Sequence, residues 1–377
     1  MNPNIPLCKP FTDSEELDLI QEILSSGWLT HGPYNKKLEE QFCELLQVKN
    51  SVCVNSCTSA LELAIKAPKI TGEVIVPSFT WVSSANAIVT GGATPVFCDS
   101  DIETRNVNLE NIDAVVTNKT QAVMVVHFGG QCCPMDEIAK YCKDKNLILI
   151  EDSAETIGGT WNGKQAGSWG LGCFSFFPTK NITTGEGGLF SCNDDELFEI
   201  VKPLMAHGIS SSTFDREKNN LHPWERIADM PGHNFRMSNL LAGIGYVQMN
   251  KLKKMNDLRI EKADFYNKLL SKSNLPLKIP FVASEAKHVY QMYTITVESG
   301  IRNELVYFLK EKGIGAGVHF TPPLHNHPFY KKNYPSLIEL PNAEYLGKSI
   351  VTLPMYPSLE NEEIEYIVEQ IRSFFNK

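Results

Sequence analysis

Long apolar segments are missing from this sequence of 377 residues. Its longest strongly apolar runs, such as the one over 147–150, have the length of a β-strand and fall far short of the ~20 residues that a membrane-spanning helix requires. The first residues, MNPNIPLCKPF, contain no basic stretch followed by an apolar core, which is the pattern of a secretory signal. We therefore expect no membrane span, no export signal and a cytoplasmic location.

An excess of basic charge is also missing. The chain has 35 Lys and Arg residues against 44 Asp and Glu residues, which gives a formal net charge of −9. No cluster of basic residues interrupts this balance, although binding to nucleic acid or to an anionic membrane requires such a cluster. We therefore expect neither partner.

Regularly spaced metal ligands are absent too. The ten cysteines are scattered through the chain and, without a secretory signal, indicate reduced thiols rather than a disulfide framework. Cys132 and Cys133 are adjacent and close to His127, but no second pair completes the ligand set of a zinc site. No GxGxxG follows an early strand, because the GEGG run at 185–188 comes late in the chain. We expect no metal, and a nicotinamide-dependent dehydrogenase is disfavoured.

The first 250 residues do contain a regular alternation of apolar strand-like runs and helical patterns. Continuous apolar strands separated by helices predict a mainly parallel sheet between two helical layers, with ligands bound at the carboxyl ends of the strands. A long helical pattern over 238–270 leads into a smaller set of elements. We expect a large α/β domain over 1–250 and a small α+β domain over 251–377, with the N-terminal residues packed on the small one. Strands are predicted at 52–54, 73–77, 94–98, 122–126, 147–150, 173–177, 188–191, 288–297 and 315–320.

A carboxylate and an amine follow two of these strands. Asp152 comes directly after the run at 147–150, and Lys180 follows the strand at 173–177. This pair suits pyridoxal phosphate, because a lysine forms a Schiff base with its aldehyde and a carboxylate keeps its ring nitrogen protonated. The released lysine can then move the proton of the carbon next to the imine. An exposed loop lysine and a turn-capping aspartate also fit the spacing, so spacing alone leaves both interpretations open.

Two polar turns could complete such a site. Residues 55–61 form a strand end, a turn and the start of a helix, which can bind an anion or serve only as an ordinary cap. Ser175 lies five residues before Lys180 and could add a hydroxyl to the same phosphate. The aromatic residues within 78–81 could stack on a pyridine ring or belong to the core.

These motifs together resemble the DegT/DnrJ/StrS family of sugar aminotransferases, which has the fold of the aspartate aminotransferases (fold type I). The resemblance covers nearly the whole chain. It is carried by SGWLTHGP at 26–33, VPSFTWVSSAN at 76–86, HFGGQ at 127–131, EDSA at 151–154, FSFFPTKNITTGEGG at 174–188, GHNFRMS at 232–238 and VHFTPP at 318–323.

The resemblance implies a role for individual residues. It makes Lys180 the Schiff-base lysine and Asp152 the partner of the ring nitrogen of pyridoxal phosphate. It places Trp81 on the ring, and it has Asn234 reach the phosphate of the neighbouring subunit in a homodimer. The remaining implied contacts are Thr58, Ser59 and Ser175 to the phosphate, and Thr30 and His319 on the sugar-substrate side.

The sequence departs from the family pattern at two positions. Glu155 stands where the family commonly has His or Gln near the phenolic oxygen of the cofactor. A carboxylate there would repel the negative oxygen unless it is protonated or turned away, and we keep it as a cofactor contact. Cys57 replaces the usual Gly before Thr58, where a packed thiol is favoured over a reactive one.

The implied activity is transfer of an amino group from an amino acid, expected to be glutamate, to a keto group of a nucleotide-linked deoxysugar, for surface polysaccharide or glycan biosynthesis. A non-catalytic or regulatory family member is one alternative. A sugar dehydratase is another, although those relatives have a histidine in place of Lys180. The nucleotide, the sugar and the aminated carbon are not specified by any motif, and the stretch 210–229 is either a substrate loop or a solvated excursion.

Overall fold

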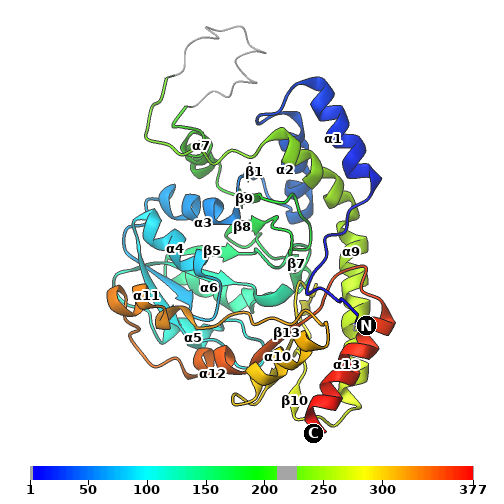
Figure 1. The fold of residues 1–377 in the computed structure, drawn as a ribbon. Helices are drawn as coiled ribbons and strands as arrows, with labels where there is room; N and C mark the ends of the chain where they lie inside the picture. Colours follow the sequence, from blue (N-terminus) through cyan, green and yellow to red (C-terminus); the bar gives the residue numbers. More distant parts are fainter. Residues whose placement is uncertain (1–2, 210–226, 377) are drawn as a thin grey trace.

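A seven-stranded sheet lies at the centre of the computed structural model, which describes residues 3–209 and 227–376 (Figure 1). Most of the stretch 210–229 lies outside the described residues. The strand order is β1-β9-β8-β5-β4-β2-β3, and pairing is parallel from β8 to β3, while β9 is antiparallel to both of its neighbours. The strands are β1 (Asn50–Val54), β2 (Glu73–Pro77), β3 (Thr94–Cys98), β4 (Thr120–Val126), β5 (Ile148–Asp152), β8 (Leu171–Ser175) and β9 (Gly188–Cys192).

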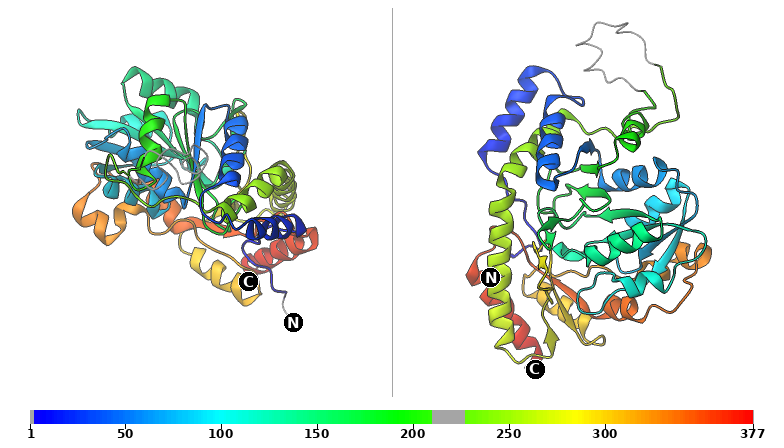
Figure 2. Two further views of the ribbon diagram at one scale, coloured as in Figure 1. Left: turned by 90° about the horizontal axis from the view of Figure 1, so that it is seen from above. Right: turned by 180° about the vertical axis from the view of Figure 1, so that it is seen from behind.

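Helices cover both faces of this sheet, as the two views of Figure 2 show. The helices of this part are α1 (Ser14–Ser26), α2 (Pro33–Leu46), α3 (Cys57–Lys66), α4 (Val82–Gly91), α5 (Leu109–Asp113), α6 (Met135–Asp144) and α7 (Asp195–Leu204), with the 3-10 turn η1 (Phe128–Gly130). Successive residues of a strand point to opposite faces, and they join different cores here. Val74 and Val76 of β2 pack in the core beneath α3 and α4, whereas Ile75 packs in the core beneath α6. Burial on both faces explains why the strands are continuously apolar.

A second sheet forms the smaller part of the molecule, in the order β10-β12-β13. Its elements are β10 (Leu277–Lys278), β12 (Tyr293–Val297), β13 (Ile350–Leu353), α10 (Arg302–Glu311) and α13 (Asn361–Phe375). Between α10 and β13, the chain returns to the core of the large sheet through η2 (Leu324–Asn326), α11 (Pro328–Asn333) and α12 (Pro341–Ser349). The long helix α9 (Asn239–Ser271) crosses the expected boundary at residue 250, and it packs on α1 and α2 near its start and on α13 near its end (Figure 2). Ile5 exchanges backbone hydrogen bonds with Gly313 and Gly315, which ties the N-terminal segment to this part.

Two strand predictions in this part are wrong. Residues 315–320 form no strand, and only an isolated bridge from Gly317 to Thr352 remains, because the unpredicted β13 occupies the place beside β12. Residues 288–292 also leave the strand that was predicted to begin there, because Tyr290 has a φ of 42° and donates its N–H to the ring of His288. A small third sheet joins β11 (Ala286–Lys287) to β6 (Thr160–Trp161) and β7 (Lys164–Gln165).

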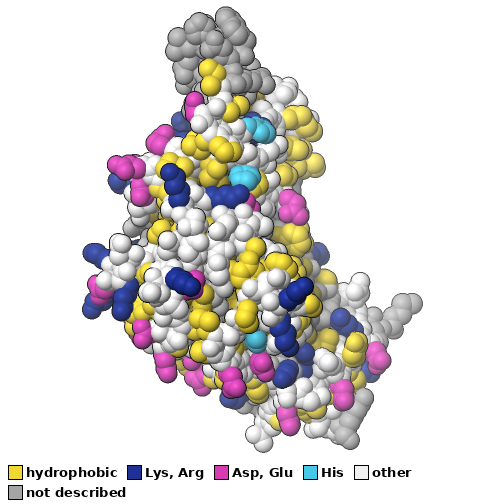
Figure 3. Space-filling view, turned by 90° about the vertical axis from the view of Figure 1, so that its left-hand side faces the viewer, with side chains coloured by type: hydrophobic (Ala, Val, Ile, Leu, Met, Phe, Trp, Pro, Cys, Tyr) yellow, Lys and Arg dark blue, Asp and Glu magenta, His cyan; other side chains and the backbone are white. Residues whose placement is uncertain are grey.

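The surface charge, the helices and the possible metal ligands of the described residues bear on which partners the chain could bind. On the face shown in Figure 3, acidic and basic side chains are interspersed rather than gathered into a patch of one sign. Every helix in the described ranges is too short or too polar to cross a membrane. Within the same ranges, no three His, Cys, Asp or Glu side chains gather as a metal-binding group.

Candidate active site

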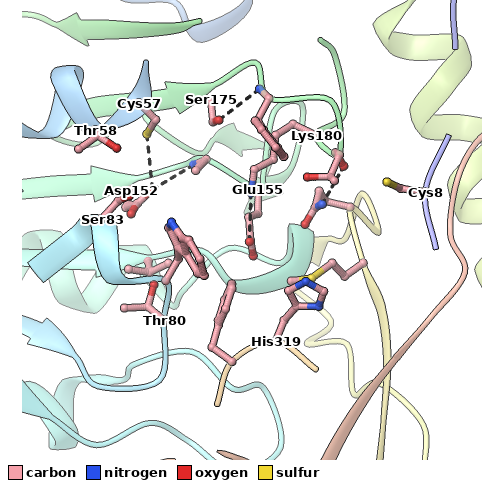
Figure 4. A pocket seen from close by; sticks show the side chains of 18 of the residues that line it. Cys8, Cys57, Thr58, Thr80, Ser83, Asp152, Glu155, Ser175, Lys180 and His319 are labelled. Atoms are coloured by element: carbon pink, nitrogen blue, oxygen red, sulfur yellow. Dashed lines mark hydrogen bonds and ion pairs between the residues drawn. The ribbon is translucent and has the colours of Figure 1, made fainter. Parts of the chain in front are cut away.

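A cavity of about 360 Å³ opens at the carboxyl ends of the central strands, between the large sheet and the smaller part of the molecule (Figure 4). Trp81 follows β2, Asp152 ends β5 and Lys180 follows β8, and all three line this cavity. Parallel strands end at the same edge of a sheet, so residues distant in sequence meet there. The amine and the carboxylate that the sequence singles out therefore lie in one site.

Asp152 is nearly buried at the cavity wall. Its carboxylate accepts hydrogen bonds from the Ser84 hydroxyl at 2.7 Å and from the Ala154 N–H at 3.2 Å. Burial raises the pKa of Asp152, while Ser84, Ala154 and the more distant Lys180 oppose that rise. A protonated ring nitrogen facing this carboxylate would supply the nearby positive charge that a buried acid lacks.

Lys180 directs its amine into the cavity toward Glu155 (Figure 4). Nζ lies 3.2 Å from one carboxylate oxygen of Glu155, and the other oxygen accepts the N–H of Gly129 at 2.8 Å. The backbone carbonyl of Lys180 accepts a hydrogen bond from the buried Arg259 at 3.5 Å. The backbone of Lys180 is thus held by Arg259, and its amine is paired with Glu155. Glu155 is one of the two positions where the sequence departs from the family pattern.

The start of α3 provides hydrogen-bond donors at one end of the cavity. Ser56 caps the helix by accepting the N–H of Ser59 at 3.1 Å, and the first N–H groups of a helix have no acceptor within it. Ser56, Cys57 and Thr58 line the cavity, and Ser175 lies across from them on β8. These groups form a cradle suited to a phosphate.

Close backbone packing shapes this cradle. A Cβ on Gly188 would lie 2.5 Å from the backbone nitrogen of Cys57, so the GEGG run allows β9 to approach the start of α3. The Cys57 thiol is buried, with Sγ 3.8 Å from a carboxylate oxygen of Asp152. Burial, with the neighbouring carboxylate, raises the pKa of Cys57 far above its usual range, so the thiol stays protonated.

The predicted phosphate residues do not all face the cavity. Thr58 and Ser175 line it, and the Ser175 oxygen accepts the N–H of Phe177 at 3.4 Å, while no acceptor for its own proton is found in the described part of the chain. Ser59 is buried behind them, and its hydroxyl donates to Asn55 at 2.7 Å. Ser59 therefore supports the turn from behind.

The aromatic residues after β2 divide between core and cavity. Phe79 is 1% exposed and packs in the core, whereas Trp81 is 60% exposed and lines the cavity. The Trp81 ring packs beside Phe320, with centroids 5.9 Å apart. An indole ring held in this way can lie against an aromatic cofactor.

His319 lines the opposite side of the cavity, and its Nδ1 lies 2.8 Å from the Thr352 hydroxyl. Burial lowers the pKa of His319, which favours the neutral ring. Thr30 and Asn234 are exposed and do not line the cavity of their own chain. Asn234 instead accepts a hydrogen bond from Arg236 at 3.4 Å.

Several residues at the site were not singled out from the sequence. Ser84 holds Asp152. Gln291 donates to the carbonyl of Thr179 at 2.8 Å, while its own oxygen is buried and has no partner within residues 3–209 and 227–376. Ser84 lies within the motif at 76–86 that carried the resemblance, so its position was a usable signal. Gln291 lies in no motif, and nothing in its sequence context marks it.

The residues present fit pyridoxal phosphate. An amine, a buried carboxylate, an exposed indole and a helix start line one cavity, and the unpartnered oxygen of Gln291 offers a further acceptor in its wall. Each of these groups matches one part of the cofactor: its aldehyde, its ring nitrogen, its ring face and its phosphate.

Comparison with known proteins agrees with this donor set. The model of the DegT/DnrJ/EryC1/StrS aminotransferase family matches residues 10–372. The chain is 37% identical to the spore coat polysaccharide biosynthesis protein SpsC of Bacillus subtilis, over 98% of this chain and 97% of that protein. Among solved structures, Helicobacter pylori PseC, an aminotransferase involved in the biosynthesis of pseudoaminic acid, is 26% identical with a TM-score of 0.91, over 99% of this chain and 100% of that one. The PLP form of Spr1654 of Streptococcus pneumoniae, a protein provisionally assigned as a sugar aminotransferase, is 27% identical with a TM-score of 0.90, over 99% of each chain.

Proposed function

The chain belongs to the DegT/DnrJ/EryC1/StrS aminotransferase family, and from this premise we propose that it transfers an amino group from glutamate to a keto group of a nucleotide-linked deoxysugar. The predicted family, fold class and pyridoxal phosphate cofactor are confirmed by the matches. The similarity to SpsC, a protein of spore coat polysaccharide biosynthesis, and to PseC, an aminotransferase of pseudoaminic acid biosynthesis, supports a sugar substrate for surface polysaccharide or glycan biosynthesis. A cytoplasmic homodimer is part of the proposal.

The meeting of Lys180 and Asp152 at one cavity is the observation that carries this function. When bound, pyridoxal phosphate supplies an aldehyde for the donor amine and a protonated ring that withdraws electrons. The Lys180 amine is the group that holds the aldehyde and, once released, carries a proton to or from the reacting carbon. Asp152 keeps the proton on the ring nitrogen, since the donors that contact its buried carboxylate among the described residues, Ser84, Ala154 and Cys57, are neutral.

The other residues hold and orient the ligands. Thr58 and Ser175 bind the phosphate, with Ser59 supporting the turn, and Trp81 stacks on the ring. Glu155 would face the phenolic oxygen, and its carboxylate contacts the amine of Lys180 at 3.2 Å. His319 lies on the substrate side.

A second copy of the chain completes the site in this proposal. Asn234 and Thr30 are exposed and lie outside the cavity of their own chain. This placement supports their contributing to the phosphate and the sugar of the partner's site. A homodimer related by a two-fold axis would then carry two such shared sites.

Absorbance tests the assignment. The purified enzyme with cofactor is expected to show a band near the visible edge that glutamate bleaches, because the amino group moves onto the cofactor. Lys180→Ala should abolish both the band and the bleaching, whereas Lys253→Ala, a change at an exposed lysine of α9, should leave them intact. Bleaching that persists in Lys180→Ala would refute the role of this lysine.

The class of the sugar substrate requires a second experiment. The enzyme, glutamate and a panel of nucleotide-linked ketosugars are incubated together, and mass spectrometry detects the aminated product. Bleaching by glutamate without any aminated sugar would retain the aminotransferase and reject the substrate class. Absence of both reactions would favour a regulatory member, and loss of a sugar hydroxyl without amination would favour a dehydratase.

A further inference from the structure

A second cavity, of about 600 Å³, lies between the loop that follows β3 and the smaller part of the molecule. It shares no lining residue with the candidate active site. Ligand cavities of several hundred Å³ are typical of small-molecule sites, which occur preferentially where two parts of a fold meet. This cavity is therefore large enough and suitably placed to hold a ligand of its own.

Arg105 places a buried positive charge in the wall of this cavity. It is only 6% exposed, and its guanidinium donates to the Thr294 hydroxyl at 2.7 Å and to the Thr296 hydroxyl at 3.2 Å. It also donates to the backbone carbonyl of Thr294 at 3.2 Å. All three acceptors are neutral, and within the described residues no carboxylate forms an ion pair with it. Burial lowers the pKa of Arg105 to about 10, which still leaves it charged at neutral pH. Buried charges in proteins are normally paired, so a counter-ion is missing here.

The loop at 101–106 holds Arg105 firmly in this place. The N–H of Arg105 donates to the carbonyl of Asp101 at 2.8 Å, and Arg105 adopts a φ of 66°, which is uncommon for a residue other than glycine. The Asp101 carboxylate accepts the N–H and the hydroxyl of Thr104 at 2.7 and 2.8 Å. The Nε of Arg105 is buried and has no hydrogen-bond partner among the described residues. The loop therefore keeps a cation at the cavity wall without satisfying it fully.

A second cation lies on the same side. Lys278 of β10 is directly opposite Thr296 of β12 in the antiparallel pair, so both side chains lie on the sheet face that Arg105 contacts. Lys278 is exposed and lines the cavity. The lining includes one carboxylate, that of the exposed Glu103, and the hydroxyls and amide of Ser271, Thr296 and Asn274.

Apart from the hydroxyl of Tyr345, the rest of the lining is apolar. Phe281 lines this cavity and leaves 48% of its surface exposed, so its ring is accessible to a ligand. Aliphatic side chains extend the same wall: Leu270, Leu275, Leu277, Ile279 and Val282. A ligand that fits must therefore combine an anionic head with an apolar ring.

We propose that this cavity is a binding site for an aromatic phosphate monoester, with the phosphate between Arg105 and Lys278 and the ring against Phe281. Arginine matches the oxygens of a phosphate through its planar fork, and lysine adds a point charge. The ligand supplies the negative charge that the buried guanidinium lacks. The site is separate from the cofactor cradle at the start of α3.

Calorimetric titration of phenyl phosphate into the full-length enzyme loaded with pyridoxal phosphate tests this proposal. Pyridoxal phosphate is itself an aromatic phosphate monoester, so the excess is removed by gel filtration after loading; the cofactor held by Lys180 stays in the cradle, and binding then reports the second cavity. We expect saturable binding of one molecule per chain. Lys278→Ala and Phe281→Ala should each lower the affinity about tenfold, since each removes the side chain that contacts one part of the ligand. Inorganic phosphate should bind more weakly than phenyl phosphate, because it lacks the ring.

Arg105→Gln should abolish binding, and the two exposed variants keep the test decisive if Arg105→Gln does not fold. Lys253→Ala is the matched control, an exposed cation of α9 that lines neither cavity, and its affinity should equal that of the parent enzyme. No saturable binding would overturn the proposal and leave Arg105 as a clamp between the loop and β12. Binding that is insensitive to Lys278→Ala and Phe281→Ala would overturn it as well.

Discussion

The donors to the Asp152 carboxylate are neutral: the Ser84 hydroxyl on one oxygen, and the Ala154 N–H and the Cys57 thiol on the other. Its nearest cation, Lys180, contacts Glu155 instead. A buried acid in these surroundings has a raised pKa, and a protonated ring nitrogen would reverse that rise. At the residue scale, the site is thus complementary to a cofactor that brings its own positive charge.

Ser84→Ala should weaken this arrangement. Removing the hydroxyl leaves one oxygen of a buried carboxylate without a donor, which costs about 1–3 kcal/mol of unfolding free energy. Cofactor retention and the rate of the glutamate half-reaction should both fall, which stopped-flow absorbance can follow. Thr90→Ala, at an exposed position on the same helix, is the control and should change neither. An unchanged half-reaction in Ser84→Ala would show that the hydroxyl has no bearing on the carboxylate's function.

The pH dependence of stability provides a second test of Asp152. Because burial raises its pKa in the folded chain above the usual 3.8, the cofactor-free folded state binds more protons than the unfolded state in the interval above 3.8. Stability must therefore fall as pH rises through that interval, by the linkage between proton uptake and folding. Thermal unfolding of the cofactor-free protein against pH should show this fall, and Asp152→Asn should remove it. Equal slopes for the two proteins would contradict the raised pKa.

At the scale of elements, the start of α3 and the strand β9 determine the shape of the cradle that we propose for the phosphate. Gly188 begins β9 and lies so close to Cys57 that no side chain fits between them. The short distance lets the helix start reach the cavity beside Ser175. The glycine run is required here by close approach of two elements, as well as by loop flexibility.

Gly188→Ala should disturb both elements. The added Cβ would lie 2.5 Å from the Cys57 nitrogen, so the backbone must shift, and we expect a loss of about 1–3 kcal/mol in unfolding free energy together with weaker cofactor binding. Urea unfolding and a fluorescence titration with pyridoxal phosphate measure the two effects. Gly300→Ala is the matched control, because nothing lies within 4 Å of its added Cβ and it should be nearly neutral. Equal behaviour of the two variants would show that α3 can move freely.

At the scale of the whole molecule, the exposed positions of Asn234 and Thr30 have a consequence for assembly. One chain encloses the amine, the acid and the start of the cradle, but not these two predicted contacts. A shared site in a homodimer would account for both. This arrangement can be tested by complementation between two inactive variants.

Lys180→Ala and Asn234→Ala, co-expressed, should recover activity that neither has alone. In a mixed dimer one site carries both changes and the other carries neither, so random pairing gives roughly a quarter of the parent activity. Activity of the purified mixture, compared with that of each variant separately, measures this recovery. If Asn234 served only its own chain, every site would keep one change and no recovery would follow.

Much of this architecture was available from the sequence alone. Strand positions follow from runs of apolar residues, and motif order identified the family, its cofactor and the segments of Asp152, Lys180 and Trp81. These signals come from residues that are neighbours in the sequence, so they can be recognised without knowing how the elements pack. The strand predicted at 315–320 failed because the choice between that segment and β13 depends on which one pairs with β12.

Tertiary packing alone decided the remaining features. It turned the Ser59 hydroxyl away from the cavity and toward Asn55. It buried Phe79 in the core and left Trp81 exposed at the cavity. It also brought Arg105 into contact with Thr294, which is 189 residues away in the sequence. Burial and counter-charge are properties of the neighbours in space, which no local pattern encodes. The sequence thus determined which elements form and which motif residues follow them, whereas the folded structure decided which side chains face a cavity and which charge is left without a partner.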